Sequence, residues 1–187
     1  MRKMMICTLL FGLADGTFAQ KPKIEADQRY LLVAANRTAI IQQEIDEAAA
    51  QGFRVVAGSP TSGTEMVLFL ERVAQPPDTY VYRLIATTKT STFEKELAAA
   101  AQEGFRLLPG TMIAKDPPAA RFVRLPQEVV AILERGPRGS KRYEYRLLAT
   151  IKTSTLQKEV SEAVKSGYAI IGMVSRDEHM VILEKEV

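Results

Sequence analysis

The chain has 187 residues, of which 47% are hydrophobic and 25% are charged, with a formal net charge of +3. This balance is typical of a folded protein, and the length suits one ordinary domain or a few small units that share a core, so a largely disordered chain and a large multidomain enzyme are both excluded. The basic excess is too small for the clustered basic face that nucleic-acid binding usually requires, so no nucleic-acid partner is expected.

The first nineteen residues have the pattern of a secretory signal. Arg2 and Lys3 give a basic start, residues 4–14 are mostly apolar, and small residues precede a cleavage point after Ala19. We predict a signal peptide at 1–19 and a periplasmic or secreted protein; the alternative is a buried N-terminal helix. The apolar run is too short to span a bilayer, so the mature chain is expected to have no transmembrane segment.

Cleavage would also change the chemistry open to the chain. It would remove Cys7, the one cysteine of the sequence, and leave 23 basic and 21 acidic residues. A mature chain without cysteine has neither disulfides nor a thiolate nucleophile, so its stability must come from its core and its hydrogen bonds.

After a linker at 20–28, three similar segments follow one another at 29–72, 80–135 and 143–187. Each one begins with a tyrosine in an alternating run, continues with an amphipathic stretch that ends at a glycine, and closes on an apolar run that ends in glutamate. The matching anchors are Tyr30, Tyr82 and Tyr145, then Gly52, Gly104 and Gly167, then Glu71, Glu134 and Glu184. This pattern indicates three degenerate tandem copies of one unit.

Within each copy, the spacing of the apolar residues changes in the same order. Residues 82–87 alternate as a strand does, and residues 93–101 place apolar side chains at helical spacing. Ser91 with Glu94, and Ser154 with Gln157, have the spacing of a capping box, which predicts that the helices begin there. The glycine predicts a helix end in the left-handed conformation, and two further strands follow it.

The copies differ chiefly in their connectors. The second copy carries an insertion at 111–127 between its last two strands, expected to form a hairpin loop, and the linkers 73–79 and 136–142 separate the copies. We therefore predict an α+β fold of three tandem βαββ repeats, with antiparallel strands and one helix per repeat on one face. A unit of this size buries too little surface alone, so the copies should pack together, either on one sheet or round a pseudo-threefold axis.

The shared pattern resembles a small bacterial domain family of unknown function. The resemblance rests on the Tyr-x-Tyr start, the helix that ends in Glu103-Gly104-Phe105, and the final strand that ends in Glu134-Arg135. Members of that family usually have one βαββ unit, often with tryptophan after the helix-ending glycine, where this chain has phenylalanine or tyrosine. The resemblance implies the fold of each unit, and it implies no activity.

The predicted helix starts are candidate sites for a small anionic ligand. Free N–H groups and the helix dipole favour an anion there, and hydroxyl and basic side chains recur at these positions. The residues are Arg37, Thr38, Lys89, Thr90, Ser91, Lys152, Thr153 and Ser154. The alternative interpretation is that they only end strands and cap helices.

Two segments that distinguish one copy from the others are candidate partner-binding sites. In the insertion, Phe122 is flanked by Arg121 and Arg124, and long loops in compact domains are often functional. The linker 135–142 has four basic residues and could meet an acidic partner. Solvated connectors are the alternative in both cases.

No residue is assigned a catalytic, metal-binding or cofactor-binding role. His179 is the one histidine in the sequence, and zinc sites or catalytic triads need further partners. We predict a non-enzymatic exported binding or scaffold protein. The alternatives are a hydrolase or lyase that uses carboxylates from several copies, and an assembly subunit, including a homo-oligomer, that pairs through its sheet edges.

Overall fold

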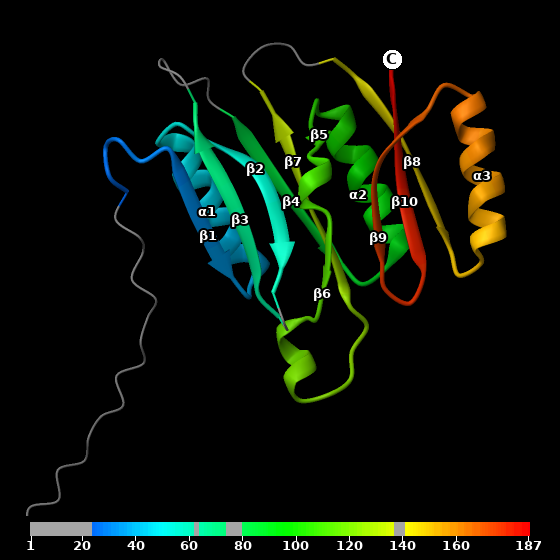
Figure 1. Ribbon diagram of the computed structural model, residues 1–187, viewed down its shortest axis with the longest axis horizontal. Helices are drawn as coiled ribbons and strands as arrows, with labels where there is room; N and C mark the ends of the chain where they lie inside the picture. Colours follow the sequence, from blue (N-terminus) through cyan, green and yellow to red (C-terminus); the bar gives the residue numbers. More distant parts are fainter. Residues whose placement is uncertain (1–23, 62–63, 74–79, 137–140) are drawn as a thin grey trace, which may run out of the picture.

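The computed structural model describes residues 24–61, 64–73, 80–136 and 141–187. The predicted signal peptide and the linker residues 74–79 and 137–140 lie outside the described residues. The described part consists of three βαββ units in a row along the longest axis of the molecule (Figure 1). This confirms the prediction of an α+β fold with three tandem repeats.

Each unit has one helix between its first two strands. Unit 1 comprises β1 (Tyr30–Ala35), α1 (Thr38–Ala50), β2 (Phe53–Pro60) and β3 (Met66–Arg72). Unit 2 comprises β4 (Val81–Thr87), α2 (Thr90–Gln102), β5 (Arg106–Leu107), the 3-10 turn η1 (Pro109–Thr111), β6 (Ile113–Lys115), the 3-10 turn η2 (Pro118–Arg121) and β7 (Glu128–Arg135). Unit 3 comprises β8 (Tyr143–Thr150), α3 (Thr153–Lys165), β9 (Ala169–Ser175) and β10 (His179–Glu186).

The last strand of every unit lies in the middle of its own antiparallel sheet. The orders are β1-β3-β2, β4-β7-β5 with β6 also on β7, and β8-β10-β9. The register is the same in all three units, since Tyr30 lies opposite Glu71, Tyr82 opposite Glu134 and Tyr145 opposite Glu184. The tyrosine and glutamate anchors of the sequence are therefore neighbours on one face of each sheet. No helix in the described ranges is both long enough and apolar enough to cross a membrane.

The helix ends agree with the sequence, whereas the helix starts do not. Gly52, Gly104 and Gly167 have φ angles of 84°, 85° and 89°, as predicted. In α2 the amides of Gly104 and Phe105 bond to the carbonyls of Ala101 and Ala100, the Schellman pattern.

The capping-box prediction is wrong. The residues before the three helices are Arg37, Lys89 and Lys152, and none makes a side-chain cap hydrogen bond. Ser91 is the second residue of α2, because the turn begins earlier, where the Lys89 amide bonds to Thr87 Oγ1.

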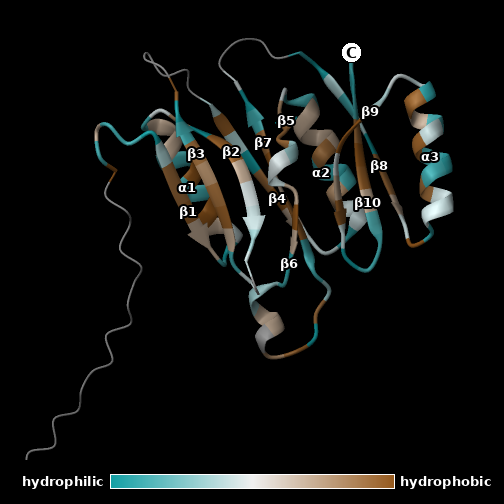
Figure 2. Cartoon of the chain, in the orientation of Figure 1, coloured by the Kyte–Doolittle hydropathy of each residue, from teal (hydrophilic) through white to brown (hydrophobic). Residues whose placement is uncertain are grey.

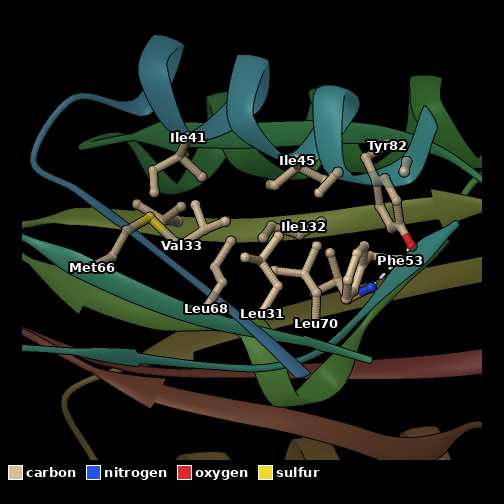
Figure 3. Close-up of a cluster of buried hydrophobic side chains, with 14 of the residues drawn as sticks. Leu31, Val33, Ile41, Ile45, Phe53, Met66, Leu68, Leu70, Tyr82 and Ile132 are labelled. Carbon is tan, nitrogen blue, oxygen red and sulfur yellow. Dashed lines mark hydrogen bonds between the residues drawn. The ribbon is translucent and has the colours of Figure 1, made fainter. Parts of the chain in front are cut away.

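The hydrophobic cores form between units as well as within them. The inner face of sheet 1 and helix α1 share one core with the facing side of sheet 2, from which Tyr82 and Ile132 enter (Figure 3). The second core joins the other side of sheet 2 and α2 to the facing side of sheet 3. Because sheets 2 and 3 close the cores of the units before them, the units stabilise one another, as their small size requires.

The side of helix α1 also covers the free edge of the next sheet. The Gln42 amide donates to the Tyr82 carbonyl at 3.2 Å and accepts from the Leu84 amide at 2.8 Å. Unpaired strand edges invite pairing with other chains, and this contact protects the edge of β4.

Candidate functional site

A polar cluster holds units 1 and 2 together beside their shared core. Arg54 at the start of β2 makes a bidentate pair with Glu134 of β7, with Nη2–Oε1 at 2.7 Å and Nε–Oε2 at 2.9 Å. The Tyr82 hydroxyl donates to Glu134 at 2.9 Å and accepts from the Val55 amide at 3.1 Å, a contact drawn in Figure 3. The Arg54 guanidinium also lies 4.6 Å from the centroid of the Tyr80 ring.

The same cluster recurs between units 2 and 3. Arg106 makes a bidentate pair with Glu184 at 2.8 and 3.0 Å, and the Tyr145 hydroxyl bonds both to Glu184 and to the Leu107 amide. Tyr143 stacks on Arg106 at 4.4 Å. We call these two clusters the junctions. In both junctions the arginine belongs to the earlier unit, and the tyrosine and glutamate belong to the unit that follows it in the sequence.

Burial and hydrogen bonding shift the pKa values of the tyrosines and arginines in the junctions. Burial, reinforced by the Glu134 charge, raises the pKa of Tyr82, and burial also raises the pKa of Tyr145. The hydrogen bond to Glu134 raises the pKa of Arg54. The hydroxyls of Tyr82 and Tyr145 stay protonated. Each donates a hydrogen bond to its glutamate and accepts one from a backbone amide. Shifted pKa values can mark catalytic groups, but here burial accounts for the tyrosine shifts and pairing with glutamate for the arginine shifts.

The insertion of unit 2 is held at its base by a buried ion pair. Lys115, the last residue of β6, is almost fully buried, and its Nζ lies 3.1 Å from Glu128 Oε2 at the start of β7. The same ammonium lies 3.4 Å from the Asn36 carbonyl of unit 1. The base of the insertion is thereby fastened both to its own sheet and to the neighbouring unit.

A second set of contacts closes the loop just beyond that pair. The Gln127 side chain donates to Asp116 at 3.2 Å, so the two ends of segment 116–127 meet. From the β9–β10 turn, Arg176 donates to the Gln127 carbonyl at 3.0 Å and to the Thr88 carbonyl at 2.7 Å. The Arg176 side chain is buried. Units 2 and 3 together therefore fix the neck of this loop.

The tip of the loop exposes apolar side chains. Phe122, directly after η2, is 88% exposed, and Val123 and Leu125 are also exposed. Figure 2 shows hydrophobic residues on this segment, at the lower edge of the molecule. Arg124 lines a shallow pocket of about 490 Å³ between the loop and the β9–β10 turn, together with Asp116, Leu125, Pro126, Gln127, Arg176 and Asp177. The side chain of Arg121 lies outside the described residues.

The predicted anion-binding residues lie at the starts of three separate helices, one in each unit, and the fold does not bring them together. At α2, Thr90 Oγ1 is already engaged, because it contacts Glu178 and accepts from Arg176 at 2.8 Å. A carboxylate of unit 3 thus lies beside the start of α2. Arg37, Lys89, Ser91, Lys152, Thr153 and Ser154 are exposed, and Thr38 is half-buried. An anion site at these starts stays a prediction.

Much of the basic linker is engaged within the chain. Arg135 donates to the Glu103 carbonyl and stacks on Phe105, and Lys141 pairs with Glu186 at 2.8 Å. Arg138 lies outside the described residues. These contacts give Arg135 and Lys141 a structural role.

One pocket, on unit 1, indicates no particular reaction. The pocket beside β1 and α1 is lined by apolar residues with Glu44, Glu47 and Gln51, and no lysine or histidine faces it. His179 lies at the start of β10, where its Nδ1 is 3.0 Å from Ser175 Oγ. Within the described residues, no cluster of histidine, cysteine and acidic side chains could hold a metal ion.

Comparison with known proteins does not extend this description. No protein-family model, curated protein or solved structure matches the chain. The resemblance of its repeats to a small bacterial domain family stays a prediction from the sequence.

Sequence reasoning proposed Phe122 and Arg124 as partner-binding residues, which stays a prediction, and it missed the residues that hold the loop. Lys115 and Arg176 are ordinary charged residues in the sequence, and only the fold brings them to Glu128 and Gln127. A signal did exist for the junctions, because arginine follows the aromatic residue after the glycine in the first two copies, where the third has Ala169.

Proposed function

We propose that this chain is an exported, non-enzymatic binding protein, and that the loop 116–127 is its contact surface for a protein partner. The observation that carries the proposal is Phe122, which is 88% exposed at the tip of a loop whose neck is fixed. Exposed aromatic side chains with apolar neighbours are typical of the residues that dominate protein–protein binding.

The fixed neck supports this function on energetic grounds. Ordering a flexible loop on binding costs conformational entropy, whereas a loop held in place before binding avoids much of that cost. The contacts of Lys115, Gln127 and Arg176 keep the loop ends together without covering its tip. Compact loops with adjoining ends are frequently functional.

The chemistry of the tip suggests what kind of partner fits. Phe122 and Val123 would enter an apolar pocket, and Arg124 beside them would face an acidic group. The proposed partner is therefore a protein with an apolar pocket next to a carboxylate. Export, which this function presumes, rests on the signal pattern of residues 1–19.

The test is capture of partners by the mature chain, followed by measurement of affinity with the purified partner. Phe122→Ala is expected to weaken binding by about 10- to 100-fold, and Phe122→Ala with Arg124→Ala to weaken it further. Ile151→Ala is the control, because Ile151 is also an exposed apolar residue but lies in the β8–α3 connection. The proposal fails if the loop variants and the control bind the same partner equally well.

A further inference from the structure

The outer face of sheet 1 exposes apolar residues that the other two sheets bury. Tyr30 is 49% exposed, whereas Tyr82 at the same position of sheet 2 is 5% exposed. Phe69 is 51% exposed, and its counterpart Ile132 is completely buried. In sheets 2 and 3 this face closes the core of the preceding unit. In unit 1 the same face has no preceding unit within the described part of the chain.

Unit 3, at the other end of the row, lacks a following sheet to cover its core. Ile170 of β9 is 54% exposed, whereas the matching Val55 and Leu107 are buried, each with its amide bonded to the tyrosine of the next unit. Val164 of α3 and Met173 of β9 are also half exposed. The third core contains residues of unit 3 alone, so its side remains uncovered where the first two cores receive a following sheet.

We propose that the chain associates with itself head to tail: the face of α3 and β9 formed by Val164, Ile170 and Met173 docks on the outer face of sheet 1 of a second copy. The contact would repeat the way in which neighbouring units pack within the chain. Every molecule has both of the faces that such a contact needs. A second copy placed by the relation that links unit 2 to unit 3 would cover Tyr30, Leu32 and Phe69 of the first.

The proposed contact between two copies lacks one interaction that both internal junctions have, and this lowers its expected affinity. Ala169 stands where Arg54 and Arg106 stand in the other units, and Glu71 is paired with Arg29 of its own unit at 2.9 Å. The bidentate ion pair is therefore missing from the intermolecular contact. Terminal repeats that stop an array usually have polar outer faces, whereas both faces here are apolar. We expect association that is weaker than the internal contacts.

The contact joins two different faces, so it does not close on itself in a dimer. Such heterologous contacts produce rings or open chains, in which mass increases with concentration. This prediction differs from pairing through strand edges, which would leave both apolar faces exposed.

The test uses light scattering on the mature chain and on two variants that each disable one face. The parent chain is expected to gain mass as its concentration rises to about 1 mM, and both Phe69→Glu and Ile170→Asp are expected to stay monomeric. Each variant retains one good face, so an equimolar mixture of the two should form a species of two chains and no larger one. Phe122→Ala is the control: it should associate like the parent, which separates this test from that of the loop.

A gain-of-function variant keeps the test decisive if the natural association is weak. Ala169→Arg combined with Arg29→Ala restores the junction pair with Glu71 and should tighten association about 10-fold or more. The proposal is overturned if this variant is also monomeric, or if the mixture of disabled variants forms no two-chain species. It is likewise overturned if only a chain shortened to begin at residue 24 associates, because residues before 24 would then be what covers sheet 1.

Discussion

Replacing Glu134 by glutamine is expected to lower the free energy of unfolding by about 2–3 kcal/mol. The Glu134 carboxylate is buried and accepts three hydrogen bonds, two from Arg54 and one from Tyr82. Glutamine keeps the shape but removes the charge and turns one acceptor into a donor. Breaking a buried pair usually costs more, and the value is reduced here because the Arg54 side chain is 45% exposed and partly screened by water. Chemical denaturation followed by circular dichroism measures the change.

The first unit provides a matched control for this substitution. Glu71 occupies the same register position in the middle strand of sheet 1, but its pair with Arg29 lies on the surface. Glu71→Gln should therefore cost less than about 0.5 kcal/mol. A double-mutant cycle with Arg54→Met should then show coupling between Arg54 and Glu134. Equal effects at Glu71 and Glu134 would mean that the junction does not stabilise the molecule.

Replacing Lys115 by methionine should lower the free energy of unfolding by about 2–4 kcal/mol. Methionine fills most of the volume of the lysine stem but leaves the Glu128 carboxylate without the ammonium 3.1 Å away. That carboxylate oxygen is itself buried, so water cannot fully replace the lost cation. The Asn36 carbonyl of unit 1 loses its contact as well. Thermal unfolding should show the loss as a lower melting temperature.

A second substitution separates the lost ion pair from poor packing. Adding Glu128→Gln to Lys115→Met removes the uncompensated charge and should recover a substantial part of the stability. Lys141→Met is the surface control, because its pair with Glu186 is exposed, and it should change stability by less than about 0.5 kcal/mol. The interpretation is wrong if the double variant is less stable than Lys115→Met.

The units could be predicted from the sequence because their signals are local. A glycine at positive φ, a helical stripe of apolar residues and alternating strands each depend on a few neighbouring residues. Gly104 and Phe105 end a helix in the structure as the sequence predicts. The start of α2 was predicted wrongly from Ser91. The residue before the helix is Lys89, two positions earlier, where the Lys89 amide bonds to Thr87 Oγ1.

The repeated arginine hinted that the junctions exist, but the partners in the contacts between units could not be predicted, because they depend on how separate sheets meet. Arg54 and Glu134 are 80 residues apart in the sequence, and their types alone suggest two solvated side chains. The burial of Lys115 was harder still to predict. Lysine is rarely buried without a partner, and its partner Glu128 comes only after the loop. From the sequence, Phe122 and Arg124 could only be proposed as partner-binding residues, and that role stays a prediction.

Hydrogen exchange at the Val55 and Leu107 amides tests the central claim that tyrosines join the units in series. Both amides donate to the tyrosine hydroxyl of the next unit, at 3.1 and 2.9 Å. They should exchange as slowly as amides of the central strands, and Tyr82→Phe should speed exchange at Val55 while leaving Leu107 slow. Fast exchange at Val55 and Leu107 in the parent chain, as at an open strand edge, would contradict the account.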